Sequence, residues 1–129
     1  MSYSPRSFSL GVDLIELRKA KSFYTRHKKN LKLFFTRQEI SAIRKSKRPH
    51  ERLAVFLAAK EAAFKASNIK NAGLMNFTNA SVNHDKRRNL SVRFRSEVFR
   101  FFIIKKKNYI VVECQKSMKS ENISRCVGI

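Results

Sequence analysis

The sequence predicts an α+β fold in which an antiparallel sheet packs against one long helix plus shorter helices. Ala and Leu dominate the segment from Pro49 to Asn68, and proline is favourable in the first turn of a helix. Hydrophobic and polar residues alternate over residues 8–14, which is typical of a strand. Three later segments have strand composition, and the last two flank a hairpin turn at residues 105–108. These segments are residues 90–94, 99–104 and 109–114.

Two shorter helices are expected between the first strand and the long helix. From about Ile15 the hydrophobic residues recur at helical spacing. Thr36 and Glu39 form a Thr-x-x-Glu capping box, so a second helix should begin at Thr36 and end by Ser46. After the long helix, residues 79–83 are expected to form a short strand.

The composition indicates one globular domain. The chain has 129 residues, and 43% of them are hydrophobic, which is enough for a core. We expect the domain to span residues 1–115 and residues 116–129 to form a loose polar tail. Two cysteines are too few for a metal site, and no signal peptide is recognisable, so we expect a cytoplasmic protein. No hydrophobic run is long enough for a membrane span.

The charge balance predicts anionic partners. Lys and Arg number 29 against 9 Asp and Glu, a net charge of +20. Nucleic acid, a phosphate-rich cofactor, an acidic protein and an anionic membrane surface all remain compatible with this charge. Two basic clusters stand out, one over residues 18–29 and one at the start of the long helix. The first contains Arg18, Lys19, Lys21, Arg26, Lys28 and Lys29, and the second contains Lys45, Lys47, Arg48 and Arg52. The second cluster suits phosphate, because free backbone N–H groups at a helix start also favour anions.

Two carboxylates occupy unusual positions. Asp13 follows Gly11 on the side of the first strand opposite to its hydrophobic residues, and a glycine lets a ligand or another backbone approach closely. Glu61 continues the hydrophobic stripe of the long helix one turn after Leu57. Glu61 could form an ordinary surface pair with Lys65, and Asp13 could cap the next helix. Both could instead belong to a metal or acid–base site, and the spacing leaves these alternatives open.

Three ordered motifs carry a resemblance to a known family. They are Gly11-Val12-Asp13-Leu14-Ile15-Glu16, Phe35-Thr36-Arg37-Gln38-Glu39 and Leu57-Ala58-Ala59-Lys60-Glu61-Ala62-Ala63-Phe64-Lys65. With this order and spacing, the chain resembles the holo-acyl-carrier-protein synthase family of 4′-phosphopantetheinyl transferases over roughly residues 8–70. The resemblance implies a 4′-phosphopantetheinyl transferase-like fold.

The resemblance also implies an activity and its residues. Members transfer the 4′-phosphopantetheine arm of coenzyme A to a serine of apo-acyl carrier protein, releasing 3′,5′-ADP, in fatty acid biosynthesis. By position, Asp13 and Glu61 would hold Mg²⁺ at the coenzyme pyrophosphate, as suits hard oxygen ligands. Glu61 and Lys65 would be the catalytic residues, with Lys65 meeting the charge on the leaving phosphate. Coenzyme A would be bound by Arg48, Lys60, Lys65 and Lys105.

The family further implies an assembly and a macromolecular partner. Members form homotrimers with active sites at the subunit interfaces, and the acidic acyl carrier protein would dock on the basic helix 18–29. The chain departs from the family pattern at two places: Phe56-Leu57 replaces Arg-Phe, and Phe102-Ile103-Ile104-Lys105 replaces Ser-Leu-Ser-His. An inactive relative of the transferase is therefore one alternative. The net charge of +20 leaves two others open, a small basic nucleic-acid-binding protein and a structural basic subunit. The sequence identifies neither the carrier protein nor the general base.

Overall fold

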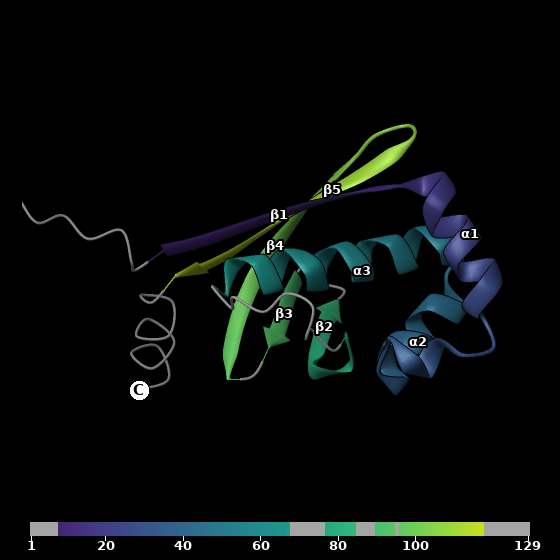
Figure 1. Cartoon of the computed structure of the whole chain (residues 1–129), viewed down its shortest axis with the longest axis horizontal. Coiled ribbons are helices and arrows are strands. Elements are labelled where there is room, and N and C mark those ends of the chain that lie inside the picture. The colour runs from purple at the N-terminus through teal and green to yellow at the C-terminus, as the bar shows by residue number, and fades with distance from the viewer. Residues whose placement is uncertain (1–7, 68–76, 85–89, 95, 118–129) are drawn as a thin grey trace, which may run out of the picture.

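A computed structural model describes residues 8–67, 77–84, 90–94 and 96–117, and these form the expected α+β arrangement (Figure 1). The sheet is antiparallel throughout, with strand order β1-β5-β4-β3-β2. The elements in chain order are β1 (Phe8–Glu16), α1 (Leu17–His27), the 3₁₀ helix η2 (Leu31–Leu33), α2 (Arg37–Lys45), α3 (Pro49–Ala66), the 3₁₀ helix η4 (Phe77–Asn79), β2 (Ala80–His84), β3 (Leu90–Phe94), β4 (Glu97–Lys105) and β5 (Tyr109–Ser117).

The expected helices and strands are present with shifted ends, and the 3₁₀ helices η2 and η4 are additional elements. Ile15 and Glu16 belong to β1, so α1 begins at Leu17 rather than near Ile15. β5 runs to Ser117, so residues 116 and 117 belong to the sheet and not to a tail. The rest of the expected tail lies outside the described residues. The hairpin turn at residues 105–108 is confirmed, because the N–H of Lys106 donates to the carbonyl of Tyr109.

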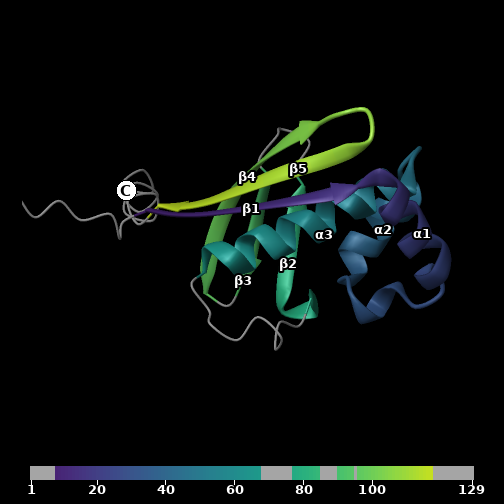
Figure 2. The ribbon, with the colours of Figure 1, turned by 45° about the horizontal axis from the view of Figure 1, so that its top comes forward.

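Helix α3 covers one face of the sheet, with α1 and α2 gathered near its N-terminal end (Figures 1 and 2). Its alanines let β1 and β5 approach closely. The clearest case is Gly11 of β1, where a Cβ atom would lie 2.0 Å from the carbonyl oxygen of Ala62. The expectation that Gly11 permits close approach of another backbone is therefore confirmed, and that backbone is α3. This contact fixes where β1 lies relative to the C-terminal half of α3.

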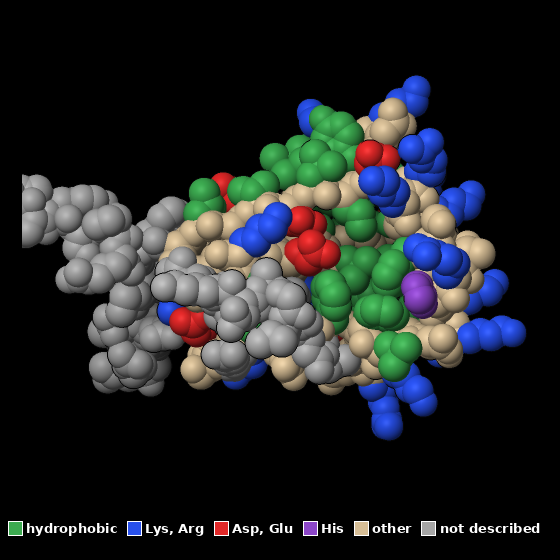
Figure 3. All heavy atoms as spheres, viewed as in Figure 1, with side chains coloured by type: hydrophobic (Ala, Val, Ile, Leu, Met, Phe, Trp, Pro, Cys, Tyr) green, Lys and Arg blue, Asp and Glu red, His purple; other side chains and the backbone are tan. Residues whose placement is uncertain are grey.

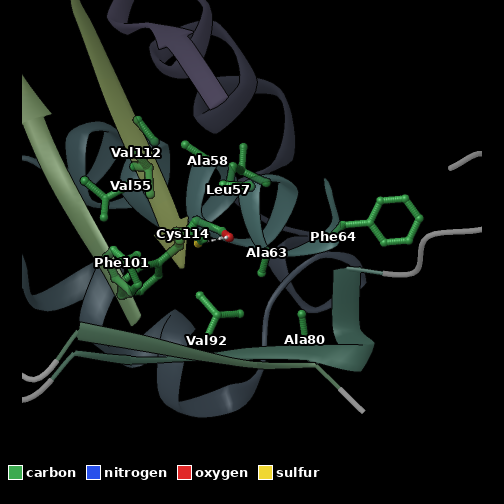
Figure 4. Packing of buried hydrophobic residues seen from close by; sticks show 14 of the residues in the cluster. Val55, Leu57, Ala58, Ala63, Phe64, Ala80, Val92, Phe101, Val112 and Cys114 are labelled. Carbon is green, nitrogen blue, oxygen red and sulfur yellow. Dashed lines mark hydrogen bonds between the residues drawn. The ribbon is translucent and has the colours of Figure 1, made fainter. Parts of the chain in front are cut away.

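The core fills the space between α3 and the sheet. Buried side chains from the helix and from β3, β4 and β5 interdigitate there, among them Phe101, Val92 and Val112 (Figure 4). Cys114 lies in the same layer, and its thiol donates to the carbonyl oxygen of Ala59 at 3.4 Å. Burial raises the pKa of the Cys114 thiol to about 12, so this thiol is unreactive at neutral pH.

The opposite face of the sheet carries several exposed hydrophobic side chains. The alternation in β1 predicted a half-buried strand without deciding which of its two sides faces the core. In the structure the side bearing Gly11 and Asp13 faces α3, and the hydrophobic side faces outward. The strand register places hydrophobic residues of β4 on the same outer face as those of β1. Together these exposed residues are Leu10, Val12 and Leu14 of β1 and Phe102 and Ile104 of β4. Figure 3 shows such side chains along the upper edge, over β1 and the β4–β5 hairpin.

Candidate active site

Asp13 and Glu61 come together where β1 crosses α3. The Asp13 side chain is 12% exposed, and Glu61 is partly buried on the adjoining turn of the helix. Burial raises the pKa of Glu61, and the Asp13 carboxylate raises it further through its charge and a side-chain hydrogen bond, while Lys65 lowers it. Figure 3 shows acidic side chains in contact near the middle of the visible face, beside a hydrophobic surface. Two carboxylates with mutually unfavourable charge therefore share one place.

Lys65 is the basic partner of this pair. Its ammonium group lies 3.1 Å from Oδ1 of Asp13 and donates at 3.1 Å to the carbonyl oxygen of Val12. A simple surface pair on α3 would join Lys65 to Glu61. Within the part of the chain that the structure describes, the ion pair of Lys65 is instead with Asp13. The Lys65 side chain is still 54% exposed, so the ammonium can also contact a ligand.

Lys60 occupies a different environment, which corrects the expectation that it binds coenzyme A. Its side chain is fully buried and 2.7 Å from Oε1 of Glu39. The ammonium also donates to the carbonyl oxygens of Phe34 and Phe77, at 3.0 and 2.8 Å. These three contacts use all three of its N–H donors. Glu39 in turn caps α2 through Thr36, as predicted. Lys60 therefore joins α3 to the neighbouring elements and presents no donor to a ligand.

Arg48 and Lys105 are brought together by a residue that the sequence analysis did not single out. Glu51, in the first turn of α3, pairs with Arg48 at 3.1 Å and with Lys105 at 2.7 Å. The hydrogen bond from Lys105 is the main cause that lowers the pKa of Glu51, and Arg48 adds to it. A carboxylate among the basic residues near Pro49 was the available signal, but only the fold shows that β4 ends beside it.

The two groups of charged residues lie at opposite ends of α3. Ten residues separate Glu51 from Glu61, which is about 15 Å along a helix axis. A hollow of about 450 Å³ lies elsewhere, between the start of α1 and the β4–β5 turn. Its lining includes Glu16, Arg18 and Tyr109, and neither charged group contributes to it. The acidic pair therefore lies outside that hollow.

The comparison with protein families decides the family. The model of the 4′-phosphopantetheinyl transferase superfamily matches residues 9–116. The chain belongs to this superfamily. The expected family resemblance and the enzyme class, a transferase, are thus confirmed. No curated protein matches the chain in sequence.

Solved structures of holo-acyl-carrier-protein synthases share the superfamily fold of this chain. One from Bacillus anthracis, in complex with CoA (3′,5′-ADP), is 24% identical with a TM-score of 0.70, covering 84% of this chain and 95% of that one. One from Neisseria meningitidis is 16% identical with a TM-score of 0.72, covering 84% and 97%. One from Helicobacter pylori, in complex with coenzyme A, is 17% identical with a TM-score of 0.68, covering 81% and 96%.

Asp13 and Glu61 offer the carboxylate oxygens that a magnesium ion prefers. Among the described residues no group of three or more His, Cys, Asp and Glu could hold a metal, but Mg²⁺ commonly binds through one or two carboxylates together with substrate phosphates. Burial and then the charge of Asp13 raise the pKa of Glu61, and a bound divalent cation would relieve the repulsion between the two carboxylates.

The two departures from the family pattern lie in α3 and at the end of β4. Phe56 and Leu57 are buried, and the guanidinium of Arg52 lies over the Phe56 ring at 6.0 Å. A cation is thus retained one helical turn before the position where the family has arginine. Lys105 ends β4 after the exposed Phe102 and Ile104.

None of the described helices is long and apolar enough to cross a membrane.

Proposed function

We propose that this chain transfers the 4′-phosphopantetheine arm of coenzyme A to a serine of an apo-acyl carrier protein, with Mg²⁺ as cofactor and 3′,5′-ADP as product. The supporting observation is the convergence of Asp13 and Glu61, from the two motifs that resemble this family, at one place on the superfamily fold. The activity belongs to fatty acid biosynthesis in the cytoplasm.

The acidic pair would hold the metal. Asp13 and Glu61 would hold Mg²⁺, which when bound would supply positive charge to the pyrophosphate of coenzyme A. Gly11 sets the approach of β1 to α3 and so holds the two carboxylates in register. Lys65 keeps Asp13 in place through its hydrogen bond and offers an exposed ammonium to the phosphate charge that develops during transfer. Positioning and charge stabilisation of this kind supply most of the catalysis in phosphoryl transfer.

The second basic group would bind the remaining coenzyme phosphates in a homotrimer. Because Glu51, which pairs with both Arg48 and Lys105, lies about 15 Å along α3 from Glu61, we infer that the active site is completed between two copies of the chain. The exposed hydrophobic face of the sheet, with Val12 and Phe102, is where copies would meet. Sedimentation should therefore give a trimer for the parent, and Val12→Arg should yield monomers; a monomeric parent would refute the assembly.

The acyl carrier protein would dock on α1. The basic side chains of α1, including Arg18, Lys19 and Arg26, are exposed in the structure. An acidic partner is attracted over long range by such a surface, which raises the association rate and makes binding sensitive to salt.

The direct test is incubation with coenzyme A, Mg²⁺ and an apo-acyl carrier protein, followed by intact-protein mass spectrometry. The carrier should gain the mass of one phosphopantetheine group, and 3′,5′-ADP should appear. A carrier of unchanged mass while the chain still binds coenzyme A would identify an inactive relative. Binding of nucleic acid without binding of coenzyme A would favour the nucleic-acid alternative.

A further inference from the structure

Glu51 occupies an unusual place between two cations. One carboxylate oxygen, Oε1, lies 2.7 Å from the Lys105 ammonium, and the other, Oε2, lies 3.1 Å from a guanidinium nitrogen of Arg48. The Glu51 side chain is 17% exposed, whereas those of Arg48 and Lys105 are 68% and 54% exposed. The carboxylate therefore lies underneath, and the two cations extend from it into solvent.

The two cations come from separate parts of the fold. Arg48 precedes α3, and Lys105 is the last residue of β4. Both carry long, flexible side chains of like charge, which repel each other and lose rotamer freedom when fixed. Without an anion between them they would separate. Glu51 is ionised at neutral pH, because both cations lower its pKa, and it gives each cation its own oxygen.

The pair also keeps donors for a ligand. Arg has five N–H donors and Lys has three, so a single contact with Glu51 leaves several unused by this carboxylate. The three charges sum to +1, so the unit still attracts an anion. A phosphate group could accept hydrogen bonds from both cations at once, which would add geometric specificity to the charge attraction.

We propose that Glu51 is a positioning residue that holds Arg48 and Lys105 together as one phosphate-binding unit. This inference rests on the proposed function, in which these two cations bind phosphates of coenzyme A. Glu51 acts through the two cations and does not itself touch the ligand. Two simpler roles make different predictions: Glu51 as a stabiliser of the first turn of α3, and Glu51 as a negative charge that weakens phosphate binding.

The experiment compares coenzyme A binding to the parent and to Glu51→Gln by calorimetry, together with transfer kinetics. The positioning role predicts about ten-fold weaker binding, or about 1.4 kcal/mol, with a raised KM for coenzyme A and unchanged kcat and carrier KM. Glu97→Gln is the matched control. Glu97 also forms an ion pair, with Lys116 at 2.6 Å, but it does not contact Arg48, Glu51 or Lys105. It should leave coenzyme binding at the parent value.

A second variant separates position from charge. Glu51→Asp keeps the charge but is too short to meet both cations in their present places, so binding should again weaken; it also serves if Glu51→Gln fails to fold. In a double-mutant cycle, Arg48→Met and Lys105→Met should be non-additive in the parent and additive in Glu51→Gln.

Several results would overturn the proposal. Unchanged or tighter coenzyme binding by folded Glu51→Gln would show that Glu51 only stabilises the helix or repels the ligand. A parent that binds coenzyme A without transferring the arm would refute the transferase function alone, and the binding measurements would still decide the role of Glu51. A parent that does not bind coenzyme A would refute both.

Discussion

Replacing Gly11 by alanine tests the contact on which the candidate site depends. The added Cβ would lie 2.0 Å from the Ala62 carbonyl oxygen and 2.8 Å from the Ala66 nitrogen, whereas ordinary contacts begin near 3.4 Å. The obstacles are backbone atoms of α3, so no side-chain rotation can make room. β1 and α3 must therefore separate by more than about 1 Å, a large displacement in a close-packed interior.

The size of the effect follows from overpacking. Insertion of a methyl group into a packed core typically costs about 1 to 3 kcal/mol, and a rigid backbone obstacle places this case at the upper end. The lower entropy of an unfolded chain with alanine offsets only about 0.4 to 1 kcal/mol. We expect a net loss of about 2 kcal/mol and a decrease in Tm of roughly 5 to 10 °C for a chain of this length.

Activity should fall further than stability. Separation of β1 from α3 moves Asp13 away from Glu61, and a misplacement of about 1 Å can cost about 100-fold in rate. The assay is thermal denaturation together with carrier modification below the melting temperature, with Ser9→Ala on the same strand as the control. A Gly11→Ala protein with the parent's Tm and activity would refute the reasoning that this glycine sets the geometry of the site.

Three further predictions concern other charged residues. Lys60→Met should destabilise the chain by about 3 to 5 kcal/mol in urea denaturation, because it leaves Glu39 buried without its cation. Adding Glu39→Leu should recover part of this loss, and a Lys60→Met protein as stable as the parent would contradict the buried pair. The Glu61 carboxyl has a higher pKa in the folded state than in the unfolded chain, so the folded state holds its proton more tightly. Without divalent cations, the free energy of unfolding should therefore fall as pH rises from the unfolded pKa of Glu61 through its folded pKa. Denaturation at several pH values should show this decline in the parent and less of it in Glu61→Gln. Reversal of Arg18, Lys19 and Arg26 to Glu should raise the carrier KM and flatten its salt dependence with little change in the coenzyme KM; a triple variant that matches the parent at low salt would place the docking surface elsewhere.

Much of the fold was predictable because local signals agreed with tertiary packing. The capping box at Thr36, the proline at the start of α3 and the hairpin turn each predicted their element within a few residues. The orientation of β1 was not predictable from its alternation. A strand can bury either side, and the contact between Gly11 and α3 decided against the hydrophobic one.

The site was predictable only in part. Motif resemblance singled out Asp13 and Glu61, which the fold places side by side. Spacing along α3 suggested that Lys65 pairs with Glu61, but β1 supplies the nearer partner from a distant part of the sequence. The burial of Lys60 and the pairing of Glu51 depend on contacts with α2, β4 and the 3₁₀ helix η4, which no local pattern encodes.

The most direct test of the acidic pair as the active site is Glu61→Gln, with carrier modification and Tm measured on the same preparation. An amide binds Mg²⁺ poorly, so transfer should be nearly abolished. Removal of a partly buried charge beside Asp13 should leave Tm at or above that of the parent without metal. An inactive protein that melts no lower than the parent is the predicted result, and an active protein with a lowered Tm would contradict the account.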